Sequence, residues 1–210
     1  MSPLLKGLLL GFSIAAPVGP IGLLCIRRSI VDGRRAGFVS GLGAATADGI
    51  YGAIAALGLT AMMNLLFAYR AWLQVGGGAF LVYLGIATLR SRPDVVGQRV
   101  RSRSEGGSEL PTCAFASTFF LTLANPMTIL SFLAIFAGAG VEVGRGILPP
   151  VLMVLGVFLG SAAWWLILST IAGCLGTRLE QGGLRIVNLV AGLVLLAAGL
   201  WQLGGVLIAL

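Results

Sequence analysis

The stretch GFSIAAPVGPIGLLCIRRSI (residues 11–30) is apolar over most of its length, has Pro17, Gly19 and Pro20 in its middle, and ends close after two arginines. An apolar run of this kind is typical of a membrane-spanning helix. Each proline, however, removes a backbone N–H and clashes with the carbonyl one turn earlier, and Gly19 lets the chain leave the helical conformation. In a membrane the freed backbone groups must meet protein or a water-filled cavity. The stretch therefore predicts a broken membrane helix.

The rest of the chain is equally apolar. Of its 210 residues, 58% are hydrophobic and only 10% are charged, which leaves too little polar surface for a soluble domain. Six apolar runs can each supply the ~20 residues that cross ~30 Å of hydrocarbon. The sequence therefore predicts an all-α polytopic membrane protein with six transmembrane helices, at residues 4–26, 38–60, 72–90, 113–139, 149–171 and 186–208.

Basic residues are distributed unequally between the two sides of these spans. Eleven lie in the loops after the first, third and fifth spans: Arg27, Arg28, Arg34, Arg35, Arg90, Arg92, Arg99, Arg101, Arg103, Arg178 and Arg185. The other side has Lys6, Arg70 and Arg145. Because such an excess faces the cytoplasm, we expect both termini outside, and we expect the arginines to set the topology only.

Three predicted spans lie on each side of one polar segment, residues 91–112, which we interpret as a flexible cytoplasmic linker. The predicted units are thus 1–90, 91–112 and 113–210. Three matches between the two halves occur in order: APVGP (16–20) with NPMTI (125–129), TADGIYG (46–52) with the overlapping stretch GSAAWWL (160–166) when Asp48 is placed on Ser161, and GAFLVYLG (78–85) with GLVLLAAG (192–199). An odd number of spans per half makes the second repeat inverted, an architecture that secondary transporters use.

The two predicted breaks fall at equivalent positions of the repeats. Pro17, Gly19 and Pro20 interrupt the first span, and Pro126, preceded by Asn125, interrupts the fourth. A helix that restarts after a break presents free N–H groups at the positive end of its dipole, where a carboxylate can bind. The alternative is a simple kink at each proline. The paired breaks favour a substrate site at the membrane midplane, although a helix-gluing hydrogen bond also accounts for Asn125.

Asp48 lies near the centre of the second span, where an ionised side chain costs at least ~2.5–3.5 kcal/mol. It shares a helical face with Gly41, Ala45 and Gly52, which indicates that it faces other helices or a cavity rather than lipid. We interpret it as a proton carrier or as the partner of an ammonium group. The alternative is a neutral carboxylic acid bonded to a neighbouring helix. Tyr51, one turn on, is a further candidate on that face.

The fifth span supplies the last candidates. Ser161 is the residue that the repeat alignment equates with Asp48. Trp164 and Trp165 lie mid-span, where one of them lines a cavity or both pack against other apolar residues, and we select Trp164 as the candidate. Gly156, Gly160 and Ala163 form a small-residue stripe. Whether that stripe packs within one chain or between two copies, as a homodimer, stays open.

Composition also argues against other classes. The three cysteines have no metal-ligand spacing and there is no histidine, so we expect no metal site. The basic residues form no face interleaved with aromatics, so we expect no nucleic-acid partner. Cys25 and Cys113 fall near the ends of the two broken spans and leave a thiol electron conduit as an alternative.

Together these residues resemble the LysE/RhtB family of amino-acid exporters, in the wider LysE-like superfamily, over essentially the whole chain. The resemblance is carried by Pro17-Val18-Gly19-Pro20, the basic loop Gly33–Gly37, Ala47-Asp48, Asn125-Pro126, and Gly160-Ser161 followed by Trp164.

The resemblance implies a proton-driven exporter of a small zwitterionic or cationic metabolite such as an amino acid, in the bacterial inner membrane, with the lipid bilayer as its surroundings, no cofactor and no enzymatic activity. The expected substrate-binding residues are Pro17, Gly19, Pro20, Asp48, Tyr51, Asn125, Pro126, Ser161 and Trp164, with Asp48 also coupling protons. A metal-ion exporter of the same superfamily and a purely structural membrane protein are the remaining alternatives.

Overall fold

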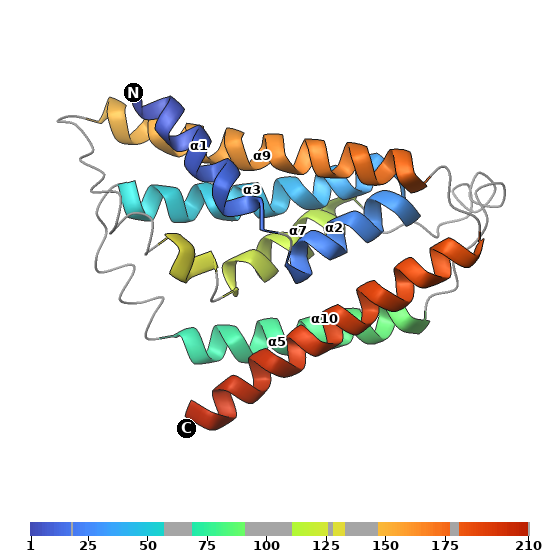
Figure 1. The fold of residues 1–210 in the computed structure, drawn as a ribbon. Helices are drawn as coiled ribbons and strands as arrows, with labels where there is room; N and C mark the ends of the chain where they lie inside the picture. Colours follow the sequence, from blue (N-terminus) through green and yellow to red (C-terminus); the bar gives the residue numbers. More distant parts are fainter. Residues whose placement is uncertain are drawn as a thin grey trace.

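The described part of the chain is helical throughout. The computed structural model describes residues 1–17, 19–56, 69–90, 111–125, 128–132, 147–176 and 181–209. The helices are α1 (Pro3–Ala15), α2 (Pro20–Val31), α3 (Arg34–Ala56), α5 (Arg70–Arg90), α7 (Pro111–Leu123), α9 (Leu148–Gly176) and α10 (Gln181–Ala209) (Figure 1). Residues 128–132 form a further short helical stretch.

The predicted spans are reproduced in part. Three described stretches are long and apolar enough to cross a membrane, Trp72–Arg90, Leu148–Gly176 and Gly183–Val206, and α1 with α2 makes a fourth if the bent pair is one span. These match the predicted third, fifth, sixth and first spans. α3 has 23 residues, but it is rich in Gly and Ala and carries Asp48, and α7 has only 13 residues.

Several predicted boundaries fall outside the described residues or need correction. The end of the predicted second span, the end of the fourth, and residues 91–110 of the predicted linker are outside the described residues. Residues 111 and 112 begin α7 instead of ending the linker. The first predicted loop is also shorter than expected, because α2 continues to Val31 and α3 begins at Arg34, with Gly33 turning the chain at a φ of 96°.

The break in the first span is confirmed. α1 closes with the Ala16 N–H donating to the Phe12 carbonyl (3.0 Å), and α2 begins at Pro20, with its axis bent by 84° from that of α1. Gly19 is extended and serves as the N-cap. Pro20 is tolerated at the first helical position because the N–H that it lacks would have no partner there.

Glycines let α1 and α9 pack backbone against backbone. A Cβ at Gly7 or Gly11 would collide with the backbone of Met153 or Val157, and a Cβ at Gly156 or Gly160 would collide with that of Leu4 or Leu8. The two glycine pairs therefore face each other across one helix–helix contact (Figure 1). The predicted stripe on α9 thus packs within the chain at Gly156 and Gly160, whereas Ala163 is exposed.

α5 and α10 make a second glycine-mediated pair along one edge of the molecule (Figure 1). A Cβ at Gly78 would meet the Gly199 carbonyl at 3.1 Å, and one at Gly85 would meet the Gly192 carbonyl at 3.0 Å. The sequence alignment equates Gly78 with Gly192 and Gly85 with Gly199. Replacing each glycine by its equivalent in the other half therefore turns the Gly78–Gly199 contact into the Gly192–Gly85 contact. Two inverted repeats would produce this reciprocity, but the repeat itself stays a prediction.

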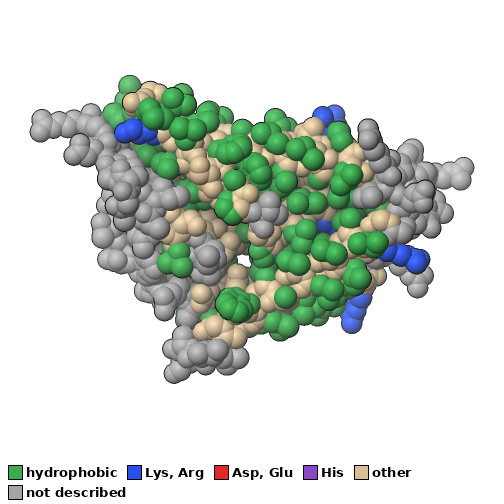
Figure 2. All heavy atoms as spheres, in the orientation of Figure 1, with side chains coloured by type: hydrophobic (Ala, Val, Ile, Leu, Met, Phe, Trp, Pro, Cys, Tyr) green, Lys and Arg blue, Asp and Glu red, His purple; other side chains and the backbone are tan. Residues whose placement is uncertain are grey.

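α2 joins the α5–α10 pair to the other helices. Leu24 on α2 packs in one buried cluster with Leu81 and Leu84 of α5, Leu121 of α7 and Leu195 of α10. The outer faces of the described helices are apolar, and arginines gather at the end of the molecule opposite both termini (Figures 1 and 2). This distribution agrees with the expected orientation, which remains a prediction.

The α1–α9 contact gives the first prediction. In Gly160→Ala the new methyl group would meet the backbone of Leu8 and Phe12, with the Phe12 nitrogen at 2.9 Å, so the helices must separate. Overpacking of this kind costs about 1–3 kcal/mol, and we expect a lower unfolding temperature in detergent, measured by fluorescence-detected size exclusion. Gly76→Ala is the matched control, because nothing lies within 4 Å of that position. Equal unfolding temperatures for the two variants would contradict this packing.

Candidate functional site

Asp48 is held in a buried chain of hydrogen bonds between α3 and α9. The Ser161 hydroxyl donates to Asp48 Oδ2 (2.7 Å), and Trp165 Nε1 donates to Ser161 Oγ (3.1 Å). All three side chains are buried. A hydroxyl has one hydrogen to donate, and that of Ser161 is used on Asp48, so Oδ2 is an acceptor. Ser161 is the only donor that the described residues provide to this carboxyl, which leaves Oδ1 for a proton or a ligand.

Asp48 and Ser161, which the repeat alignment makes equivalent positions of the two halves, are in direct contact. Their helices α3 and α9 pack side by side, a contact that the sequence did not predict. The bond to α9 also agrees with the alternative interpretation of Asp48 as a carboxylic acid bonded to a neighbouring helix. The two interpretations of Asp48 differ in whether Oδ1 takes part in transport, by binding a proton or an ammonium group, and this difference is functional.

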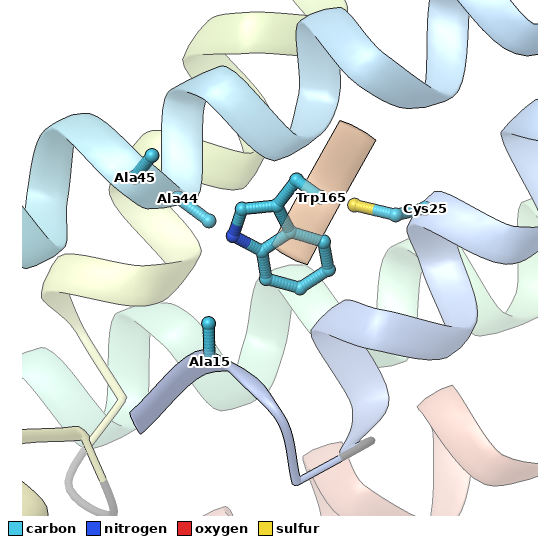
Figure 3. Packing of buried hydrophobic residues seen from close by; sticks show 5 residues of the cluster. All are labelled: Ala15, Cys25, Ala44, Ala45 and Trp165. Carbon is cyan, nitrogen blue, oxygen red and sulfur yellow. The ribbon is translucent and has the colours of Figure 1, made fainter. Parts of the chain in front are cut away.

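Trp165 is the aromatic residue of this site, although of the two mid-span tryptophans the sequence favoured Trp164. It packs in a buried cluster with Ala15, Cys25, Ala44 and Ala45, which come from α1, α2 and α3 (Figure 3). Its position one helical turn after Ser161 is the signal that could have identified it, because residues four apart share a helix face.

A glycine makes room for the Trp165 ring. A Cβ at Gly41, on α3, would lie 2.6 Å from Trp165 Cγ. The small residue that the sequence placed on the face of Asp48 thus allows α3 to approach the tryptophan on α9.

Trp164, the predicted aromatic, lies elsewhere. Its ring meets Phe12 of α1 edge-on, with centroids 5.3 Å apart, and it packs against the edge of the Trp165 cluster. Its Nε1 is buried and has no hydrogen-bond partner among the described residues. A buried N–H without an acceptor is costly, so this N–H is a candidate donor.

The break between α1 and α2 lies beside the same cluster. Ala15, the last residue of α1, packs with Trp165, as Figure 3 shows. Pro17 and Gly19 are exposed, and a Cβ at Gly19 would meet nothing within 4 Å. The first N–H groups of α2 have no acceptor within the helix, so they are candidate donors at the break.

Tyr51 supports the second break. Its hydroxyl donates to the carbonyl of Leu123, the last residue of α7, and its ring is buried against Phe132, with centroids 5.5 Å apart. A carbonyl at the end of a helix lacks its usual partner, and Tyr51 replaces that partner. This is a structural task that the sequence reasoning did not assign to Tyr51.

Asn125 starts the next helical stretch. Its carbonyl accepts from the N–H groups of Thr128 (3.1 Å) and Ile129 (3.3 Å), and its own N–H donates to the Thr122 carbonyl (3.2 Å). The side chain is partly buried. Pro126, the other predicted residue at this break, lies outside the described residues.

Arg28 corrects the expectation that the arginines set topology only. Its side chain is 1% exposed, and its guanidinium donates to Ser40 Oγ (3.0 Å), Thr118 Oγ1 (3.1 Å) and Ser117 Oγ (2.9 Å), and also to the Ala114 carbonyl (3.2 Å). The prediction failed because the span was ended at the first charge. α2 instead continues to Val31, and its inner face carries Arg28 into the protein.

Cys25 is a buried free thiol, whereas Cys113 and Cys174 are exposed. No group of three or more His, Cys, Asp and Glu side chains that could hold a metal ion occurs in the described ranges.

Comparison with known proteins places the chain among translocators. The profile of a family described as "LysE type translocator" matches residues 12–203. The "Putative amino acid efflux protein YcgF" of Bacillus subtilis is 30% identical over 96% of this chain and 95% of its own length. The "Uncharacterized membrane protein YahN" of Escherichia coli is 29% identical over 53% of this chain and 49% of its own length. No solved structure was found to match.

The contact between Gly41 and Trp165 gives the second prediction. In Gly41→Ala the methyl group must displace Trp165, which would break its bond to Ser161 and lower the unfolding temperature. In a background with Trp72, Trp164 and Trp201 changed to Phe, we also expect a shifted emission of the remaining tryptophan. Gly49→Ala is the control on the same helix, because its nearest neighbour lies at an ordinary 3.6 Å. An unchanged emission in Gly41→Ala would show that the ring is not held as described.

Proposed function

The chain belongs to the LysE type translocator family, and from this premise we propose that it exports amino acids or closely related small metabolites across the bacterial cytoplasmic membrane. It is a multi-pass membrane protein and a translocator, not an enzyme. The finer statements, namely the substrate class, the direction of transport and its coupling to protons, are our proposal. The name of the Bacillus subtilis relative, which aligns over nearly its whole length, supports amino acids as the substrate class.

The observation that carries the proposal is the buried carboxyl of Asp48 with one oxygen engaged. Ser161 and Trp165 orient Oδ2 and leave Oδ1 to interact with a proton or an ammonium group. An ionisable residue at this depth is costly and typically marks a substrate or proton pathway. We assign Asp48 this role. Ser161, one of the predicted binding residues, acts by positioning the carboxyl.

Neutral donors would hold the substrate carboxylate. The first turn of α2, restarting at Gly19 and Pro20, offers backbone N–H groups and the positive end of the helix dipole. Trp164, whose indole N–H has no partner among the described residues, packs against the cluster next to this break. We propose that both face the carboxylate, and that Pro17 keeps the break open. The second break, at Asn125 and Pro126, would contribute in the same way from the other half, with Tyr51 supporting it.

The proposed mechanism is alternating access by two inverted three-helix repeats. Units 1–90 and 113–210 would rock around the site, with six spans in total and both termini outside. The bond between Asp48 and Ser161 joins two positions that the alignment equates, and the glycine contacts of α5 with α10 exchange with each other when equated positions are exchanged. Both features support this arrangement. Protonation and deprotonation of Asp48 would couple export to the proton-motive force.

The third prediction tests the function directly. Bacterial cells loaded with dipeptides, with and without the protein, should release one or a few amino acids faster when it is present, as measured for all twenty in the medium. Asp48→Asn should abolish the increase, because it removes the ionisable oxygen. Asp32→Asn makes the same chemical change after the end of α2 and should export normally. If no amino acid is released faster while the protein is present in the membrane, the proposed substrate class is wrong.

The fourth prediction concerns Ser161. In Ser161→Ala the carboxyl loses its donor, and hydrogen bonds to charged groups contribute about 1.5–3 kcal/mol, so we expect the export rate to fall roughly tenfold or more. Ser169→Ala is the control on the same helix, since that buried hydroxyl donates only to the Leu166 carbonyl of its own helix among the bonds described. Equal export by the two variants would argue against an oriented Asp48.

A further inference from the structure

The last turn of α2 carries two adjacent arginines that reach different neighbours. Arg28 is buried and donates to hydroxyl groups on α3 and α7. Arg27 points to another helix, where its Nε donates to Asn188 Oδ1 of α10 at 2.9 Å. Neighbouring positions on a helix do not face the same way. The two side chains therefore connect this end of α2 to α3 and α7 on one side and to α10 on the other.

An apolar layer closes the same end of the molecule. Ile30 of α2, Ala172 of α9 and Leu184 of α10 are buried together. A Cβ at Gly176 would meet the backbone of Ile30 at 2.8 Å, so α9 approaches α2 closely there. The opposite end of α2 differs, because Pro17 and Gly19 are exposed and Gly19 faces open space. α2 is therefore held by hydrogen bonds and close packing at its arginine end, whereas the break that precedes the helix is exposed.

We propose that Arg27 and Arg28, with Asn188, form a latch that holds α2 closed at the arginine-rich end of the transporter. The inference rests on the proposed transport function. Opening towards that end requires the Arg28 hydrogen bonds to Ser40, Ser117 and Thr118 and the Arg27 bond to Asn188 to be exchanged for water. Such exchange has a small net free energy per bond, so a latch of this kind can open repeatedly. The three residues position the helix and do not contact the substrate.

The chemistry of Arg28 suits this role. A guanidinium has five N–H donors in a planar fork, which lets one side chain bind several oxygens on α3 and α7. A lysine ammonium would bind fewer oxygens in a less defined direction. Arg28→Lys should therefore retain the charge but weaken the latch.

Cys25 is a natural reporter of the opening. It lies one turn before Arg28 on α2 and is 1% exposed, so a water-soluble thiol reagent cannot reach it while the latch is closed. With Cys113→Ser and Cys174→Ser it is the only thiol in the chain. Labelling by a membrane-impermeant maleimide, in inverted and in right-side-out vesicles, measures opening from each side separately and needs no substrate.

The experiment compares latch variants with a matched control. We expect Arg27→Gln, Arg28→Gln and Arg28→Lys to be labelled at least fivefold faster than the parent from the arginine-rich side only. Asn188→Asp should be labelled more slowly than the parent, because a carboxylate binds Arg27 more strongly than an amide does. Arg35→Gln removes the same charge from an exposed position and should change labelling less than twofold.

Three results would overturn the latch. The first is unchanged labelling of the folded Arg27→Gln and Arg28→Gln variants, provided that Cys25 reacts after unfolding in detergent. The second is faster labelling from both sides together with a lower unfolding temperature, which would indicate general loosening. The third is faster labelling of Asn188→Asp. If Arg28→Gln does not fold, the Arg27 and Asn188 variants decide. If the variants are labelled as expected but the protein exports no amino acid, the proposed substrate class is wrong and the latch is still supported.

Discussion

The hydrogen bond from Ser161 to Asp48 is the interaction on which the arrangement around the site depends. A carboxyl group in the middle of an apolar helix needs a polar partner, because no water is present in the bilayer core to replace it. α9 supplies that partner and must therefore lie against α3. The contact requires a small residue at Gly41, places Trp165 between the helices, and brings the end of α1 against the same cluster at Ala15.

Other helix pairs approach each other closely through glycine contacts. Without a hydrophobic driving force between them in lipid, membrane helices associate through close packing of small residues and through hydrogen bonds. The contact of α1 with α9 and that of α5 with α10 both use glycine against backbone. α2 also packs against glycine, at Gly37 of α3 and Gly176 of α9. Its two arginines add hydrogen bonds to α3, α7 and α10.

The failure at Arg28 has a physical explanation. Rules for membrane topology assume that charge leaves the hydrocarbon, and they work because most arginines are exposed to water. A buried polar environment for Arg28 is provided by Ser40, Ser117 and Thr118. The topology rule does not take such residues into account, because they are not sequence neighbours of Arg28 and their hydroxyl groups give no sign of this contact. The same charge therefore serves as a topology signal in the sequence and as a tie between helices in the structure.

The sequence by itself determined what depends on neighbouring residues. The apolar runs predicted helices, Pro17, Gly19 and Pro20 predicted the break that separates α1 from α2, and Asp48 stood out as a costly residue that needs a partner. Only the tertiary structure decided which side chains meet. In the structure Trp165, and not Trp164, donates to Ser161, and the Tyr51 hydroxyl donates to the Leu123 carbonyl. Arg28 is buried between helices. The reason is that the rotation of each helix about its axis is set by packing against distant segments, which local sequence does not encode.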